Sequence, residues 1–228
     1  MALRAGARAG PKTARKRGSW YKSSVMAVAP LPPPTWVRFT TEGAAKVAPV
    51  GSTLDRYRVA EVRAVRGAPL AGLSVGAAFF RVQSTVELPS GAGDLVGVTQ
   101  HLGYTRAAER AELATTEVPG AEATCVLIPM TKSSAWWQLA HDERDAIFRG
   151  SGRPGHVNVG LPFARTISRT LYHSRPVPGA GFDFLTYFEF LPARRGEFVE
   201  LLRGLRDEAK NPEWGYVERE CEVWLSRA

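Results

Sequence analysis

Apolar residues interrupted by polar ones give several strand-like segments in the first half of the chain. These segments lie at about 55–65, 76–84 and 94–101. The stretch TRAAERAELAT at 105–115 is rich in good helix formers and predicts a short helix. The first half is therefore expected to consist mainly of strands, and the folded part of the chain is expected to begin near Trp36.

The second half predicts a more complete series of strands and helices. The helix expected at 193–209 carries its apolar residues on one stripe, and Ser133 or Ser134 can cap the helix before it. In order, the expected elements are a strand at 125–130, a helix at 133–148, strands at 164–174 and 182–190, a helix at 193–209 and a strand at 214–226.

Strand, helix, strand, strand, helix, strand is the split βαβ pattern of the ferredoxin-like fold. We therefore expect an α+β protein with an antiparallel sheet, in which residues 121–228 form one ferredoxin-like half and residues 36–120 form a shortened N-terminal half. In the last strand Glu218, Glu220 and Glu222 alternate with apolar residues and are expected to face solvent. The fold by itself indicates no function.

Charge is distributed unevenly along the 228 residues. The formal net charge is +8, but residues 1–35 hold seven Lys or Arg side chains and no acid, so the rest of the chain is close to neutral. This segment, which includes the run PLPPP, is expected to be a disordered basic tail, with a leader similar to an organelle transit peptide as the alternative. The nearly neutral remainder shows no nucleic-acid-binding motif, so no nucleic-acid partner is expected.

Apolar runs and cysteines limit the classes of protein further. No apolar run approaches the roughly 20 residues that span a bilayer, so no membrane association is expected. Cys125 and Cys221 lie far apart in apolar segments, which predicts free buried thiols and is compatible with a reducing, cytoplasmic location. Without a CxxC pair or a Cys/His cluster, a structural zinc site is not expected.

His156 is the first candidate for chemistry. It follows the glycine-rich segment GSGRPG and precedes a mostly apolar stretch. The residues alone leave two interpretations open: a structural histidine, or an imidazole presented to a nonpolar pocket, where it could ligate haem iron. No second histidine stands three or four residues away, which argues against a helical zinc pair.

Arg169 is the second candidate, because the strand pattern places it on the same face as the apolar Ile167 and Leu171. An arginine in such a place is unusual unless it is paired or functional. It could form a buried ion pair, for instance with Glu189, or line a pocket for a small anion.

The remaining candidates have simpler interpretations. His173 is expected to be a structural hydrogen-bonding residue, and His101 and His141 are expected to be surface residues. Adjacent helical positions cannot face one way, so Trp136 and Trp137 are expected in the core or at an interface.

Several motifs in order resemble the chlorite dismutase family, and most of all its short, dimeric branch. The resemblance spans about residues 36–228 and implies a homodimer of ferredoxin-like subunits that form an antiparallel, barrel-like α+β structure. It also implies haem b as cofactor and chlorite as a small anionic substrate. The motifs are LVGVTQHLGYTRAAERAEL at 95–113, PMTKSSAWWQLAHDER at 129–144, His156, SRTLYHS at 168–174, FDFLTYFEF at 182–190 and EWGYVERECEVWL at 213–225.

The resemblance implies roles for individual residues. His156 would be the proximal ligand of the haem iron, and Arg169 would be the catalytic residue on the distal side. Glu213 would hydrogen-bond the proximal imidazole and make it more electron-rich. Lys132 matches a lysine of the proximal or propionate network, and Tyr104 and Trp136 would line the haem.

One feature departs from the family pattern. The segment between Trp136 and His156 is longer than usual by several residues, which the GSGRPG region accounts for, whereas the spacing from His156 to Arg169 is that of the family. The site therefore depends on how this insertion folds.

The implied reaction converts chlorite to chloride and dioxygen, with a fixed guanidinium acting where anionic charge develops. One alternative is a haem peroxidase or a coproheme-handling enzyme. The other is a haem-free or haem-sensing ferredoxin-like binding module in which the insertion has displaced His156.

Overall fold

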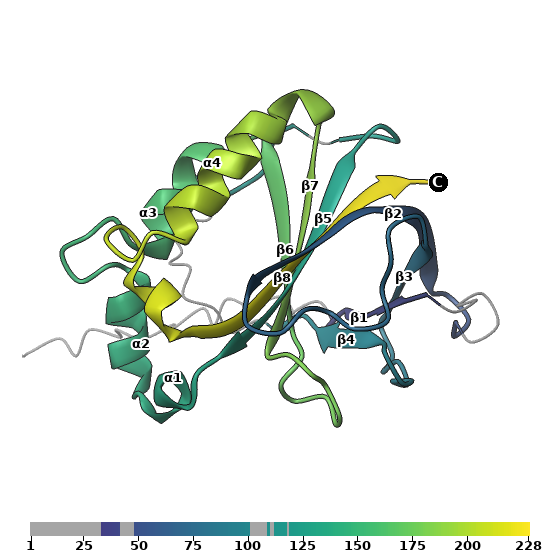
Figure 1. Ribbon diagram of the computed structural model, residues 1–228, viewed down its shortest axis with the longest axis horizontal. Coiled ribbons are helices and arrows are strands. Elements are labelled where there is room, and N and C mark those ends of the chain that lie inside the picture. The colour runs from purple at the N-terminus through teal and green to yellow at the C-terminus, as the bar shows by residue number, and fades with distance from the viewer. Residues whose placement is uncertain (1–32, 42–47, 101–108, 110–111, 118) are drawn as a thin grey trace, which may run out of the picture. The chain divides into compact units, whose positions relative to one another are not determined.

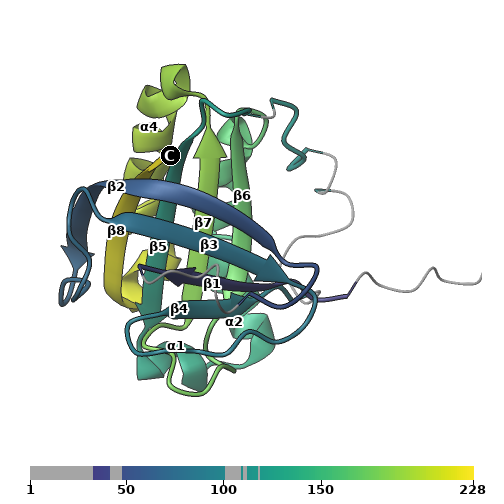
Figure 2. The same ribbon diagram turned by 90° about the vertical axis from the view of Figure 1, so that its right-hand side faces the viewer.

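A barrel of antiparallel strands carries helices on one side (Figures 1 and 2). The computed structural model describes residues 33–41, 48–100, 109, 112–117 and 119–228. The strands within these residues are β1 (Trp36–Thr40), β2 (Thr53–Arg66), β3 (Ala78–Ser84), β4 (Leu95–Val98), β5 (Thr124–Lys132), β6 (Ile167–His173), β7 (Phe184–Phe190) and β8 (Val217–Arg227). They close the barrel in the order β1-β3-β2-β8-β5-β7-β6-β4.

The strands of the two halves of the chain share this barrel. β2 pairs with β8, and β4 pairs with β6 through Val98 and His173. In Figure 2 the strands of the first half cross in front of those of the second half. The expected α+β class with an antiparallel barrel is confirmed. The boundary between the halves near residue 120 stays a prediction.

Helices cover the side of β5–β8 that faces away from β1–β4 (Figure 1). They are α1 (Ser134–Gln138), α2 (His141–Phe148), α3 (Gly155–Gly160) and α4 (Arg195–Leu205). The stripe expected on α4 is confirmed, because Phe198, Leu201 and Leu202 are buried against the sheet. No helix within the described residues has the length and apolar character needed to cross a membrane.

Two cores cover the two faces of β5–β8. One fills the barrel interior and includes Phe39, Tyr57, Leu127 and Tyr187. The other lies between the strands and α4 and includes Phe198 and eight further buried residues: Val126, Ile128, Ile167, Phe188, Phe190, Leu201, Leu202 and Trp224. Successive side chains of a strand point to opposite faces, so these four strands have no face that is wholly solvated.

The prediction that three acids of β8 face solvent is wrong for two of them. Glu218 is exposed, but Glu220 and Glu222 are 3% and 1% exposed. Their face is opposite to that of Val223, as the alternation predicts, but α4 covers it. Arg206, at the end of α4, forms ion pairs with both carboxylates, with Nε 2.8 Å from Glu220 and Nη1 2.6 Å from Glu222, and Arg63 lies 3.8 Å from Glu222.

The helix expected over 133–148 is divided into α1 and α2. Leu139 and Ala140 between them have extended backbone, with ψ of 145° and 165°. Side chains satisfy the backbone groups at this break: Arg144 donates to the Leu139 carbonyl over 2.7 Å, and the Ala140 N–H donates to Glu143 over 2.7 Å. The helix expected at 105–115 lies largely outside the described residues, and residues 112–113 form a turn.

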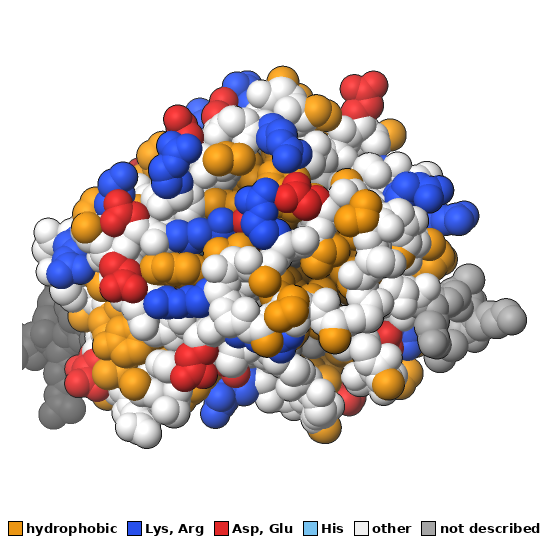
Figure 3. All heavy atoms as spheres, viewed as in Figure 1, with side chains coloured by type: hydrophobic (Ala, Val, Ile, Leu, Met, Phe, Trp, Pro, Cys, Tyr) orange, Lys and Arg blue, Asp and Glu red, His pale blue; other side chains and the backbone are white. Residues whose placement is uncertain are grey.

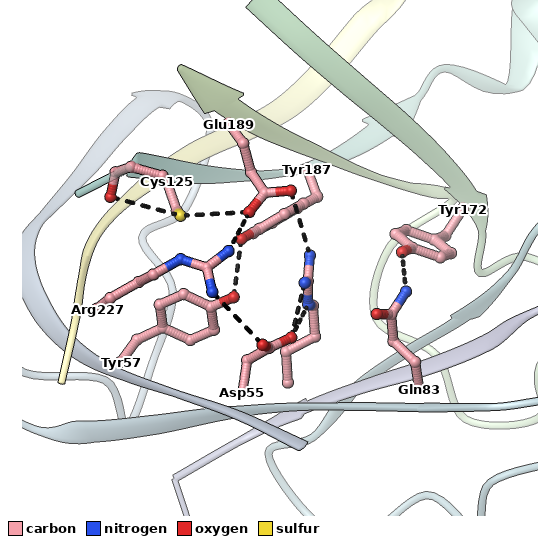
Figure 4. A network of polar contacts seen from close by, with 10 residues as sticks. Asp55, Tyr57, Gln83, Cys125, Tyr172, Tyr187, Glu189 and Arg227 are labelled. Carbon is pink, nitrogen blue, oxygen red and sulfur yellow. Dashed lines mark hydrogen bonds and ion pairs between the residues drawn. The ribbon is translucent and has the colours of Figure 1, made fainter. Parts of the chain in front are cut away.

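A ring of ion pairs lies at one end of the barrel (Figure 4). Arg81 donates twice to Asp55, over 2.9 and 2.6 Å, and lies 3.9 Å from Glu189. Arg227 donates to Glu189 over 2.6 Å and lies 3.6 Å from Asp55. Two acids and two arginines thus balance each other's charge.

Beneath this ring lie buried phenols and a thiol. The hydroxyls of Tyr57 and Tyr187 are 2.8 Å apart, and burial raises the pKa of both. The thiol is that of Cys125, whose Sγ is 3.9 Å from a carboxylate oxygen of Glu189. Cys125 and Cys221 are both free and buried, which confirms the prediction for the two cysteines.

Candidate functional site

The GSGRPG segment forms a tight turn that fixes the start of α3. Gly150 and Gly155 have φ of 96° and 72°, a region that favours glycine. A Cβ on Gly155 would lie 2.3 Å from the carbonyl carbon of Arg149. The Gly155 N–H also donates to the Lys210 carbonyl over 2.8 Å. His156, the next residue, is therefore held beside the segment that leads into Glu213.

Two charged side chains, those of Glu213 and Lys132, lie behind the His156 ring. Glu213 lies in a 3-10 helix, Pro212–Tyr216, and Lys132 is the last residue of β5. One carboxylate oxygen of Glu213 lies 2.6 Å from His156 Nδ1, and the other accepts from Lys132 Nζ over 2.8 Å. The Lys132 side chain is only 2% exposed. The structure thus brings together three residues that lie far apart in the sequence.

The electrostatics of this group determine the protonation of His156. Desolvation lowers the pKa of His156, although Glu213 acts in the opposite sense. Desolvation also acts to raise the pKa of Glu213, but the charges and hydrogen bonds of Lys132 and His156 outweigh it and hold that pKa well below its usual range. At neutral pH the imidazole is therefore neutral, and its Nδ1–H donates to an ionised carboxylate.

Arg169 lies on the other side of the ring, on β6. Its Nη1 is 3.0 Å from His156 Nε2. A guanidinium can only donate, so Nε2 carries a lone pair, consistent with a proton on Nδ1. Arg169 is exposed, and desolvation by the protein atoms around its guanidinium lowers its pKa. The alternative of a pair with Glu189 is not observed, because Glu189 bonds Arg227 instead.

Aromatic rings support the imidazole and the lysine. Phe148 stacks on His156 with a centroid distance of 4.4 Å and an interplanar angle of 18°. Trp136 is buried, packs against Tyr216 at 5.5 Å between centroids, and has Lys132 Nζ 4.9 Å from its ring centre. Phe148 was not expected from the sequence, where it is simply the last residue of a helix.

The other candidates lie away from this group or cannot be placed. Tyr104 and His101 fall outside the described residues. His141 is exposed at the start of α2, as expected. His173 packs edge-on against Phe184 at 5.3 Å between centroids, and desolvation lowers its pKa.

The arrangement suits a metal that brings most of its own ligands. Within the described ranges, no three His, Cys, Asp or Glu side chains gather as a metal site. His156 offers one neutral nitrogen lone pair, and its other nitrogen is fixed by a carboxylate, which orients the ring and raises its basicity. A cofactor whose metal needs a single protein ligand therefore fits this donor set, and Arg169 supplies a cation for an anion beside it.

Comparison with known proteins finds solved structures with a similar fold. No family model matches the chain. The crystal structure of dimeric chlorite dismutase from Nitrobacter winogradskyi is 30% identical, with a TM-score of 0.65, over 84% of this chain and 99% of that one. A chlorite dismutase structure from Candidatus Nitrospira defluvii, in complex with imidazole, is 23% identical over 85% of this chain and 90% of that one, with a TM-score of 0.57, and shows a similar fold.

A curated relative points the same way over a shorter length. The chlorite dismutase of Ideonella dechloratans is 32% identical over 130 residues, which are 55% of this chain and 41% of that protein. The match thus spans about two-fifths of the curated relative. Together with the nearly full-length match to the Nitrobacter structure, the fold and the sequence show that this chain belongs to the chlorite dismutase family.

Proposed function

We propose that the protein is a haem b enzyme that converts chlorite to chloride and dioxygen, with His156 as the iron ligand and Arg169 as the catalytic residue. One observation carries the proposal. A neutral imidazole, fixed at Nδ1 by Glu213, directs its Nε2 lone pair toward the exposed guanidinium of Arg169, whose Nη1 is 3.0 Å away.

The residues behind His156 would tune the ligand. Glu213 is ionised and accepts from Nδ1–H, so it increases the electron density on the imidazole. Lys132 holds the second carboxylate oxygen and keeps Glu213 ionised. Trp136 supports the Lys132 ammonium from one side. Tyr104 is proposed to line the haem on the basis of the family motif alone.

Bound haem b would supply iron that exchanges electrons with the O–Cl bond of chlorite. The task of Arg169 is to attract the anion and to stabilise negative charge as it develops, as a cation beside the reacting atoms does. Because a guanidinium stays protonated, Arg169 performs this role at any physiological pH.

Cofactor binding requires Arg169 to move. Nη1 of Arg169 donates to the same Nε2 lone pair that would bind iron, and one lone pair cannot serve both. Its accessible side chain can swing away from His156. The guanidinium would then face the substrate rather than the ligand.

All described residues assigned to the site lie within 121–228, so we propose that this part is the haem-binding half and that residues 36–120 are the shortened N-terminal half.

We also propose a homodimer, because the similar chlorite dismutase from Nitrobacter winogradskyi is dimeric.

Oxygen production tests the proposed reaction. Protein loaded with haem b should release one dioxygen and one chloride for each chlorite consumed, as an oxygen electrode and a chloride assay would measure. Loaded protein that releases no oxygen from chlorite but turns over hydrogen peroxide, or that decarboxylates coproheme with peroxide, would instead be one of the two haem-handling alternatives.

A further inference from the structure

The carboxylate of Asp183 joins the ends of three elements near Lys132. One oxygen accepts from the Lys132 backbone N–H over 2.8 Å and from the Trp137 indole N–H over 3.3 Å. The other accepts from Arg175 over 3.3 Å. Asp183 is 7% exposed. Its position, just before β7, thereby connects the end of β5, helix α1 and the segment after β6.

The contact with Lys132 occurs where β5 leaves regular pairing. The register between β5 and β8 shifts between Thr131 and Lys132. The Asp183 N–H still bonds the Met130 carbonyl over 2.9 Å, whereas its side chain receives the Lys132 N–H. The carboxylate thus fixes the backbone of Lys132 at the point from which its side chain extends to Glu213.

The indole of Trp137 is also held firmly. It stacks on Phe184 with centroids 5.8 Å apart, and the Arg175 guanidinium lies 4.0 Å from its ring centre. These two neighbours hold the ring, so the indole N–H cannot easily turn to another acceptor. Asp183 therefore has several fixed donors and little freedom to move.

We infer that Asp183 is a positioning residue for the proximal group: it acts through Lys132 on Glu213, and through Glu213 on His156. This role rests on the proposed function, because its effect appears on the iron ligand. Without the carboxylate, the Lys132 N–H and the Trp137 indole lose their buried acceptor, and the backbone must shift to satisfy them. Lys132 then no longer holds Glu213 in place.

The direction of the effect follows from the geometry at Glu213. Lys132 Nζ lies 2.8 Å from one carboxylate oxygen, and the other oxygen lies 2.6 Å from His156 Nδ1. A displaced Lys132 no longer holds the carboxylate against Nδ1–H, so this hydrogen bond weakens and the imidazole becomes a weaker donor to iron. The iron–histidine stretching band of the ferrous haem protein should move to lower frequency, and the midpoint potential should rise.

The test uses four proteins, each loaded with haem b: wild type, Asp183→Ala, Lys132→Met and the double variant. It compares their resonance Raman spectra and midpoint potentials. We expect both single variants to lower the band, and the double variant to move it no further than Lys132→Met does, because the two residues act in one chain. Asp183→Asn keeps one acceptor oxygen and should shift the band in the same direction by less. If the alanine variant does not fold, the asparagine variant decides in the same way.

Asp55→Ala is the matched control, because Asp55 is also an ion-paired aspartate. It lies on β2 near the last residues of β8, whereas Lys132 pairs with Val217, the first residue of β8. The control should lower the melting temperature and leave the band unchanged. An unchanged band in Asp183→Ala, with only a lower melting temperature, would overturn the role of Asp183. Wild type without any iron–histidine band would instead overturn the proposed function, and the role of Asp183 with it.

Discussion

At the scale of single residues, the site depends on the protonation of one imidazole. His156 is neutral because its surroundings desolvate it, and its Nδ1–H is committed to Glu213. The sequence identified His156, Arg169, Lys132 and Glu213 through family motifs. It carried no signal for Phe148 or Asp183, because their contacts with the site depend on how distant segments fold together.

The lowered pKa of His156 predicts acid sensitivity. The unfolded histidine, with the ordinary pKa of 6.5, binds a proton before the folded one does. Stability from this group is therefore fully present above pH 6.5 and is lost as the pH falls toward the folded pKa. In protein without haem, His156→Gln should lose less unfolding free energy than wild type between about pH 7.5 and about pH 5.5, as urea denaturation would measure.

His173 also has a lowered pKa, but it is present in both proteins, so the difference between them isolates His156. Equal losses of stability in the two proteins would contradict a neutral, buried imidazole at position 156.

Arg169 should affect turnover but not cofactor binding. Arg169→Ala removes the guanidinium from His156 Nε2, so haem should bind at least as tightly, whereas chlorite turnover should fall by about 100- to 1000-fold, the usual cost of losing one charge-stabilising donor. Absorbance titration with haem and oxygen release would measure the two effects. Arg203→Ala, an exposed change on α4, is the control and should alter neither. Unchanged oxygen release from Arg169→Ala would refute the catalytic role.

At the scale of elements, the sequence predicted the strands better than the helices. Alternation predicted two strands of the second half, at 164–174 and 214–226, a short apolar run predicted the one at 125–130, and aromatic residues predicted the one at 182–190. The apolar stripe predicted helix α4. The break between α1 and α2 was missed because side chains of Glu143 and Arg144, rather than a proline or glycine, satisfy the backbone there. The buried acids of β8 were missed because alternation shows that two faces differ but does not show that a helix covers the second one.

The glycine turn before α3 can be tested against a neighbouring glycine. Gly155→Ala should destabilise the protein by about 2–4 kcal/mol, because a Cβ there meets backbone atoms and φ is 72°. Gly160→Ala, in the same helix with open space around its Cβ, should be neutral or slightly stabilising. Urea denaturation of both variants measures the difference. Equal stabilities would contradict the turn as the element that fixes His156.

At the scale of the whole barrel, the polar groups of the ion-pair ring are separated from those of the candidate site. The ion-pair ring of Asp55, Arg81, Glu189 and Arg227 lies at one end of the barrel (Figure 4), whereas His156 lies on the helix side of the sheet. On the face shown in Figure 3, basic side chains are interspersed with acidic ones. The ring and this face therefore both keep opposite charges close together.

Arg81→Met tests the structural role of the ring. Arg81 is 8% exposed, and its loss leaves the two carboxylates of Asp55 and Glu189 with Arg227 alone, so stability should fall by about 3 kcal/mol. Arg227→Met should cost less, because its side chain is 31% exposed. Thermal denaturation would measure both. A change in the haem spectrum of Arg81→Met would contradict the separation of the ring from the site.

The absorption spectrum of the purified protein titrated with haem b tests the central claim most directly. Wild type should give a sharp Soret band that saturates at one haem per chain, and His156→Ala should lose it or give the broad band of weakly held haem. A wild-type protein without a Soret band, or a His156→Ala spectrum identical to that of wild type, would contradict His156 as the ligand of a haem enzyme.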